Sequence, residues 1–350
     1  MSSKALLSNR ILPLLLFPTI SYYAFKTMFD YALQAGTLHK LSAQCTAPTP
    51  YTLAYTGIKY IDSVLCSLVA FFDIMLEPKH SIPFNVELLT GLAALAIVPY
   101  LEAARHGRNP VLEIHWVLGI IYQKLTGGVI FPIYWMLFIV TGAAGLHFSS
   151  HRAGAGSIDQ RHAESVVFTL VVAYILPSIA MLVMRDPYVI AFWQAFPLWM
   201  FLAQRLYLGL RPAAPQSGAK TVRAIYMGLF FLSSIPHIYL VTPILFRSSD
   251  PLQTLRTLFL PSFTPLDPKS TTLDHGVQDF IQWDGFFMLV STFIAMLWIA
   301  GPSVKRLSIL VVWLVQTVVF GPGAIIAGVF WWREALIQEG MDVEERKKST

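Results

Sequence analysis

The stretch Val98–Trp116, VPYLEAARHGRNPVLEIHW, decides the fold of this chain. A long apolar run leads into it, and Glu102 lies near the end of that run, just before a short basic hinge. The chain then turns directly into apolar sequence that carries Glu113 and His115. Ionisable side chains at membrane depth are costly and usually mark function. The stretch therefore predicts two carboxylates near one rim of a membrane-embedded helical bundle.

The composition indicates a polytopic membrane protein. Of the 350 residues, 55% are hydrophobic and only 13% are charged, and the mean hydropathy is +0.58. A soluble protein of this length would carry about a quarter charged residues. The net charge of +5 is spread over the loops, which argues against a nucleic-acid partner. We expect a single integral-membrane helical domain over residues 1–350, with 331–350 as its tail.

Apolar runs of about 20 residues, the length that crosses a bilayer, predict an all-α transmembrane bundle with eight or nine spans. The predicted spans are 11–33, 53–76, 84–104, 127–147, 165–184, 188–208, 224–246, 279–300 and 307–331. The sixth is aromatic-rich with a central Pro197, so an interfacial position is also open. The segment 111–125 is too short to cross and is expected to be re-entrant or interfacial. In the loop 247–277, the patch LQTLRTLFLP predicts an amphipathic surface helix over one mouth of the bundle.

The two cysteines suggest no cross-link. Cys45 lies in a predicted loop and Cys66 inside an apolar run, which indicates neither a disulfide framework nor a metal site. We expect Cys66 to be a small packing residue. The start of the chain resembles a signal peptide, but apolar sequence continues to about Tyr31 without a cleavage signature, so a retained first span is predicted.

Two acidic residues lie in apolar sequence without a local cation. Asp284, in DFIQWDGFFMLV, has no basic residue within two helical turns, and Asp73, in AFFDIMLEP, lies among phenylalanines. Parity over nine spans places Glu102, Glu113 and Asp284 in the half of the bundle nearest the C-terminal tail, and Asp73 in the other half. The sequence thus predicts that one rim gathers most of the buried charge.

For several other ionisable residues, a structural role as an ion pair or a packing residue is as well supported as a catalytic role. Glu102 with Arg105, or Glu113 with Arg108, would form interfacial ion pairs that anchor the hinge. His237, in SSIPHIYL, lies mid-span beside a proline, where a hydrogen-bonded packing role competes with a catalytic one.

Burial changes the proton affinity of such carboxyl groups and so makes them candidates for acid catalysis. A carboxyl group in an apolar pocket without a cation has a raised pKa, stays protonated and is a candidate Brønsted acid. Aromatic faces beside it attract positive charge, which suits a carbocation reaction on an apolar substrate. The sequence contains no GxSxG, no HExxH and no phosphate-binding glycine loop. It also lacks the paired aspartate-rich motifs that hold magnesium diphosphate, so we expect no metal and no cofactor.

Three acid-bearing stretches carry a family resemblance: FFDIMLEP at Phe71–Pro78, VPYLEAARHGR at Val98–Arg108 and FIQWDGFF at Phe280–Phe287. With the chain length and the all-helical layout, they resemble the fungal integral-membrane terpene cyclases of meroterpenoid biosynthesis, in particular the longer macrophorin- and ascofuranone-type group. The resemblance implies a farnesylated aromatic polyketide as substrate. It also implies protonation of a terminal alkene or epoxide, followed by cation cyclisation without a metal or a diphosphate leaving group.

The resemblance leads to expected roles for individual residues. Asp284 or Glu102 would be the acid, and Glu113 or Asp73 the partner carboxylate or final base. The residues expected to bind the substrate are Trp283, Phe286, Trp116, Tyr100 and His237. Three alternatives stay open: a proton-coupled transporter of a small apolar metabolite, a membrane enzyme of sterol-isomerase type, and a non-catalytic scaffold.

The C-terminal sequence EERKKST suggests a location. Lys347 and Lys348 stand fourth and third from the end, as in the dilysine retrieval signal of endoplasmic-reticulum membrane proteins. This predicts an endoplasmic-reticulum membrane protein with a cytosolic tail. The expected partners are the lipid bilayer and a prenylated small molecule, and the sequence identifies no protein partner.

Overall fold

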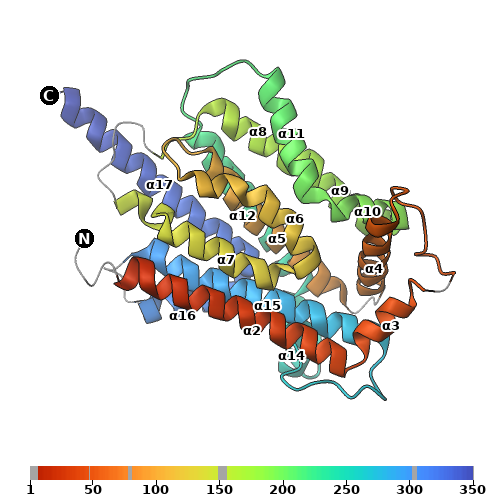
Figure 1. Ribbon diagram of the computed structural model, residues 1–350. Helices are drawn as coiled ribbons and strands as arrows, with labels where there is room; N and C mark the ends of the chain where they lie inside the picture. The colour runs from red at the N-terminus through yellow and green to blue at the C-terminus, as the bar shows by residue number, and fades with distance from the viewer. Residues whose placement is uncertain (1–6, 47, 78–80, 149–155, 302–305, 350) are drawn as a thin grey trace.

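The fold is known from a computed structural model, which describes residues 7–46, 48–77, 81–148, 156–301 and 306–349. Within these residues the chain forms helices and no strand, apart from an isolated bridge between Asp159 and Ser217. Most of the helices run side by side along one direction, as a bundle (Figure 1). The all-α prediction is confirmed.

The helices follow one another along the chain, with longer connections at 44–58 and 260–272. The elements up to residue 148 are η1 (Leu7–Ile11), α2 (Leu12–Gln34), α3 (Thr37–Ala43), α4 (Lys59–Leu76), α5 (Ile82–Ala104), η3 (Pro110–Ile114), α6 (His115–Leu125), α7 (Gly127–Val140) and η4 (Ala143–Phe148). Those after residue 155 are α8 (Gln160–Leu170), η5 (Val171–Ile175), α9 (Leu176–Met184), α10 (Pro187–Gln194), α11 (Phe196–Leu210), α12 (Ala219–Leu240), α13 (Thr242–Arg247), α14 (Pro251–Phe259), α15 (Leu273–Ala300), α16 (Arg306–Phe320) and α17 (Pro322–Ser349). Asp159, Asp186 and Asp250 accept backbone N–H groups of the first turns of α8, α10 and α14, as helix N-caps do.

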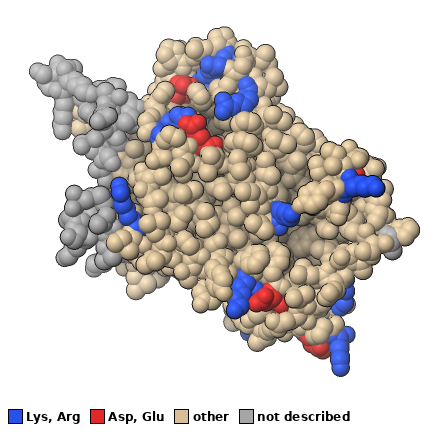
Figure 2. Space-filling view, viewed as in Figure 1, with Lys and Arg blue, Asp and Glu red and all other residues tan. Residues whose placement is uncertain are grey.

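Among the described residues, five helical segments are long and apolar enough to cross a membrane. They are Asn9–Gln34, Ile82–Ala104, Gln160–Met184, Ala219–Arg247 and Leu273–Ala300. Figure 2 shows a broad uncharged expanse across the middle of one face, with Lys, Arg, Asp and Glu gathered toward its margins. Large apolar side chains such as Leu15, Val183 and Tyr239 are exposed on the outside of the bundle, which suits contact with lipid.

The span count of eight or nine is not confirmed. The predicted span 53–76 is helical only from Lys59, and 188–208 is divided at Ala195 between α10 and α11. The prediction of one span over 307–331 is wrong, because this segment contains the end of one helix and the start of another. Gly321, with φ +83° in the left-handed region, ends α16, and α17 starts at Pro322.

The predicted gathering of buried charge at one rim is also wrong in part. α2 begins and α17 ends at the same end of the bundle, so the parity of nine crossings does not apply (Figure 1). Glu102 lies in the last turn of α5 at that end, and Glu113 follows the hinge. Asp284 lies about 24 Å from the end of α15 at Ala300, taking a rise of 1.5 Å per residue. Asp284 therefore lies deep in the bundle and does not share the rim of Glu102.

A helical hairpin places polar backbone groups inside the bundle. α6 ends at Leu125, and Thr126, with φ +76°, reverses the chain into α7. A Cβ atom at Gly127 would lie 2.5 Å from the sulfur of Met288, so a larger residue there would displace the Met288 side chain where α7 packs on α15. The segment 111–125 forms only η3 and the short helix α6, as its predicted length indicates, and its re-entrant or interfacial position stays a prediction.

The cysteine prediction is wrong. Cys45 and Cys66 form a disulfide, with 2.06 Å between the sulfur atoms and a separation of 21 positions in the sequence. The bond ties the loop after α3 to the middle of α4. Two cysteines without a recognisable spacing carry no local signal of pairing, because only the folded chain brings them together.

Candidate active site

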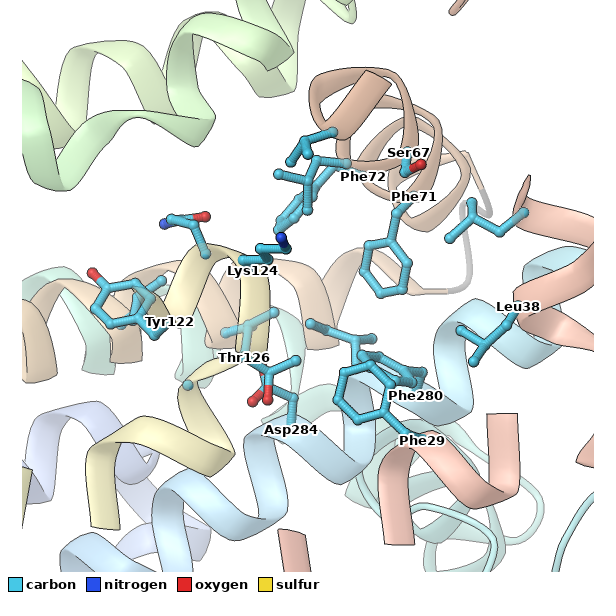
Figure 3. Close-up of a pocket in the computed structure, with 18 of the residues that line it drawn as sticks. Phe29, Leu38, Ser67, Phe71, Phe72, Tyr122, Lys124, Thr126, Phe280 and Asp284 are labelled. Atoms are coloured by element: carbon cyan, nitrogen blue, oxygen red, sulfur yellow. The ribbon is translucent and has the colours of Figure 1, made fainter. Parts of the chain in front are cut away.

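A cavity of about 380 Å³ lies beside the turn of the α6–α7 hairpin. Its walls come from α2, α3, α4, α5, α6, α10 and α15. The volume lies within the range of about 300–1,000 Å³ that is typical of small-molecule pockets. Figure 3 shows Phe71, Phe280 and Asp284 around this space. The cavity is large enough for an apolar molecule and has few polar groups to bind one.

Asp284 is the one carboxylate among the described residues that line this cavity. Its side chain is buried, and its Oδ1 accepts the backbone N–H of Gly128, the second residue of α7. A helix N-terminus favours a carboxylate, because the first N–H groups of the helix have no partner within it. The hydroxyl of Thr126 lies beside the same carboxyl group (Figure 3). The hairpin therefore holds Asp284 in place and stabilises its deprotonated form.

Glycine makes this contact possible. A Cβ atom at position 128 would lie 2.9 Å from the backbone oxygen of Asp284 and 3.0 Å from the Cβ of Phe287. A larger side chain would thus push α7 away from α15. The two glycines Gly127 and Gly128 allow the backbone of α7 to lie close to the carboxyl group of Asp284.

Asp284 has no cationic partner. In the described part of the chain, no Lys, Arg or His forms an ion pair with it. Lys124 lines the same cavity, but its Nζ donates to the hydroxyl of Tyr60 at 3.1 Å and lies over the Tyr60 ring. An acid held by neutral donors alone can exchange its proton with a guest without first breaking a salt bridge.

Aromatic rings surround the remaining space. Phe280 packs edge-on against Phe29 and Phe71, with ring centroids 5.5 Å and 5.6 Å apart. Phe71 also packs against Phe72, which contacts Trp193. All five rings line the cavity. The negative faces of such rings attract a positive charge that forms within the cavity.

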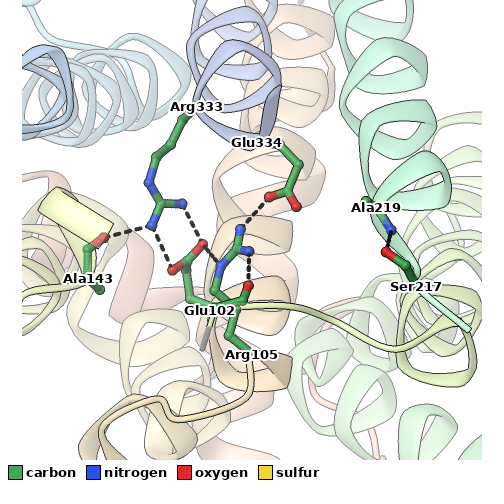
Figure 4. Close-up of polar contacts among 8 residues, drawn as sticks. Glu102, Arg105, Ala143, Ser217, Ala219, Arg333 and Glu334 are labelled. Atoms are coloured by element: carbon green, nitrogen blue, oxygen red, sulfur yellow. Dashed lines mark hydrogen bonds and ion pairs between the residues drawn. The ribbon is translucent and has the colours of Figure 1, made fainter. Parts of the chain in front are cut away.

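Glu102 has a different environment. It is fully buried and lies between two arginines: Arg105 Nε donates to Oε1 at 2.8 Å, and Arg333 donates to both oxygens at 2.7 Å and 3.1 Å. Arg105 also bonds Glu334, and Arg333 donates to the Ala143 carbonyl oxygen at 2.7 Å (Figure 4). Two acids and two bases thus form a neutral cluster that joins α5 to α17. This pairing favours a structural role for Glu102.

The two other expected carboxylates are paired with arginines and are less buried than Asp284. Glu113 pairs with Arg108 at 2.8 Å and is half exposed. Asp73 pairs with Arg185 at 2.9 Å and accepts the hydroxyl of Tyr51 at 2.8 Å. Neither lines the cavity that contains Asp284.

The five expected substrate-binding residues do not come together. Tyr100 and Trp116 line a narrow space of about 20 Å³, where the Tyr100 hydroxyl donates to the Pro197 carbonyl oxygen. Phe286 and His237 line another cavity of about 450 Å³. Trp283 packs among Phe263, Phe286 and Phe287 and lines neither large cavity.

The site around Asp284 includes residues that the sequence analysis did not select. Phe71, Phe72 and Phe280 lie within the acid-bearing stretches, next to residues that were selected. Thr126 and Gly128 carried a visible signal, a Thr-Gly-Gly break between two apolar runs. Among the described residues, no group of three or more His, Cys, Asp or Glu is arranged to hold a metal ion.

Comparisons with known proteins identify relatives over most of the chain. It is 25% identical over 327 residues to the terpene cyclase ascI of Acremonium egyptiacum, covering 86% of this chain and 84% of the relative. It is 24% identical to the terpene cyclase sdgD of Emericella nidulans (77% and 75% covered) and 22% identical to the terpene cyclase atmA of Aspergillus flavus (77% and 80%). No solved structure matches the chain significantly. The CtvD domain model matches residues 12–338, and the chain therefore belongs to the CtvD family.

Proposed function

We propose that this chain is a membrane-bound terpene cyclase that begins ring formation by donating a proton from Asp284. The observation that carries the proposal is a carboxyl group without a cationic partner on the wall of an aromatic cavity. The relatives named terpene cyclases support the class of reaction. The substrate would be a farnesylated aromatic polyketide with a terminal alkene or epoxide, as in meroterpenoid biosynthesis.

The proposed reaction balances without a further reactant. The Asp284 proton adds to the terminal alkene carbon or to the epoxide oxygen, and a tertiary carbocation forms. Internal double bonds attack it in turn and form new carbon–carbon bonds. A C–H bond next to the last cation then returns its proton to the Asp284 carboxylate, the one carboxylate among the described residues that line the cavity, and the electrons of that bond form a double bond. The substrate is thereby isomerised and the acid is regenerated.

The surroundings of Asp284 suit this first step. The N–H of Gly128 stabilises the carboxylate that remains after proton transfer, which makes the transfer less unfavourable. The rings of Phe71, Phe72 and Phe280 stabilise the cation and offer no nucleophile to trap it.

The test uses two aspartates of one helix. Asp279 is also buried on α15, and its Oδ1 accepts the backbone N–H of Ser262, but it does not line the cavity. Microsomes containing the chain are incubated with a linear farnesyl phenol and with its terminal epoxide, without metal or nucleotide. Asp284→Asn should lower cyclisation at least about 100-fold, the usual contribution of a general acid. Asp279→Asn should retain it. Full activity of Asp284→Asn at equal expression would refute the assignment.

A transporter is the second candidate, because α6 and α7 meet as short helices inside the bundle, as broken helices do in many transporters. The same substrates decide between the two functions. Uptake into sealed vesicles without new ring products would favour transport, whereas new rings in open membranes favour the cyclase.

We further propose that residues 1–350 form one integral-membrane domain of the endoplasmic reticulum with a cytosolic C-terminal tail. The side chains of Lys347 and Lys348 lie outside the described residues. The disulfide between Cys45 and Cys66 supports this orientation. It lies near α3 and α4, at the end of the bundle opposite the end of α17, which would then face the lumen (Figure 1). Disulfides persist in the oxidising lumen and are rare in the cytosol.

A further inference from the structure

Most of the polar side chains that line the cavity with Asp284 lie at two separate places. One is the contact of α15 with the turn between α6 and α7, where Asp284 and Thr126 lie. The other is the contact between the end of α6 and α4. Most of the remaining wall is apolar. The polar residues on the α4–α6 side are Ser63, Ser67, Gln123 and Lys124.

The α4–α6 side is the open side of the cavity. Tyr60 is 70% exposed, whereas Asp284 is 8% exposed. Tyr60, Ser63 and Ser67 are three and four positions apart, so they lie on one face of α4. Lys124 is exposed as well, and its side chain reaches toward Phe72, away from Asp284 (Figure 3). A molecule that fills the cavity would thus have one end at the surface and the other at Asp284.

Lys124 supplies a positive charge at this opening. Its Nζ donates to the hydroxyl of Tyr60 at 3.1 Å and lies 5.6 Å from the centre of the Tyr60 ring. In the part of the chain that the structure describes, no carboxylate forms an ion pair with Lys124. An ammonium group has three N–H donors, so donors remain after the bond to Tyr60. Lys124 therefore has both charge and hydrogen bonds left for an anion.

We propose that the substrate is a prenylated aromatic carboxylic acid, whose carboxylate binds Lys124 and whose prenyl end lies at Asp284. This inference rests on the proposed cyclase function and makes Lys124 a specificity-determining residue. A carboxylate has two oxygens, which suits the ammonium of Lys124 and the amide of Gln123 beside it. The reverse orientation would bury the carboxylate next to Asp284, where no cation balances it.

Binding to the Asp284→Asn chain in lipid nanodiscs tests the proposal without turnover. The radiolabelled probes are a farnesyl hydroxybenzoic acid and its primary carboxamide, which has nearly the same shape and no charge. Adding Lys124→Met should weaken binding of the acid about tenfold, a difference of about 1.4 kcal/mol, and leave binding of the amide unchanged. Comparing variants for each probe cancels the different partition of the two probes into lipid.

Two further variants and the ionic strength sharpen the test. Lys124→Arg should keep the preference for the acid. Lys59→Met is the matched control, because Lys59 is an exposed lysine of α4 that does not line the cavity, and it should change neither affinity. Added salt should reduce the advantage of the acid, since a charge pair at an exposed opening is screened.

Three results would overturn the proposal. An equal loss for acid and amide in Lys124→Met would make Lys124 a packing residue. No loss for either probe would assign Lys124 to lipid headgroups. Failure of the acid to bind the Asp284→Asn chain would exclude it as the ligand. Ring formation by the wild type is measured separately. Selective binding of the acid without rings would refute only the cyclase proposal, whereas rings without a preference for the acid would refute only this one.

Discussion

The buried cluster of Glu102, Arg105, Arg333 and Glu334 makes a quantitative prediction. Arg333→Met removes three charge-assisted hydrogen bonds, two to Glu102 and one to the Ala143 carbonyl oxygen. It also leaves two carboxylates facing one arginine inside the bundle. Removing one partner of a buried ion pair typically costs about 3–5 kcal/mol. We expect a loss of this size in the free energy of unfolding.

Neutrality of the cluster can be restored by a second change. Glu102→Gln alone leaves two arginines with one carboxylate, whereas Glu102→Gln combined with Arg333→Met leaves the Arg105–Glu334 pair in charge balance. The double variant should therefore be about 2 kcal/mol less destabilised than the sum of the single variants, within the coupling seen for residues in contact.

The assay is thermal unfolding of the detergent-solubilised chain, followed by size-exclusion chromatography after heating. For a chain of this size, about 2 °C per kcal/mol implies that each single variant lowers the unfolding temperature by about 6–10 °C. A Glu102→Gln protein that unfolds at the wild-type temperature and has lost cyclisation would refute the structural role and make Glu102 a catalytic acid.

Two further predictions concern the cavity that contains Asp284, and a third concerns the disulfide. Phe280→Leu keeps an apolar wall but removes a ring that stabilises the cation, so product formation should fall about 2- to 30-fold, the range of a single cation–π contact, as measured by product chromatography. Gly128→Ala should displace α7 from the acid and abolish cyclisation, whereas Gly209→Ala, in open space, should leave the rate unchanged in the same assay. Cys66→Ser should lower the free energy of unfolding by about 3 kcal/mol, the value for a cross-link that closes a loop of this length, and the wild type should show the same loss on reduction of the Cys45–Cys66 bond.

Much of the fold could be predicted from the sequence. Apolar runs near Val98 and Asp284 determine long helices, because a bilayer requires every backbone hydrogen bond to be made within the segment. The acidic stretches and the layout indicated the family. The short segment before Gly127 was recognisable, since a largely apolar segment of 15 residues cannot cross a membrane. Helix ends inside apolar runs, such as the one at Gly321, could not be predicted, because a glycine is compatible with both a helix and a turn.

The sequence by itself determined that this is an apolar helical chain with a small set of buried acids, and that Asp284 has no cation nearby along its own helix. Only the tertiary structure decided which of these acids lacks a cationic partner among the described residues. Arg333 lies 231 residues from Glu102, Arg185 lies 112 residues from Asp73, and Gly128 lies 156 residues from Asp284. Local spacing reveals partners three or four residues apart on one helix. The charge on a buried acid depends on what packs against it from other helices, and that is a property of the folded bundle.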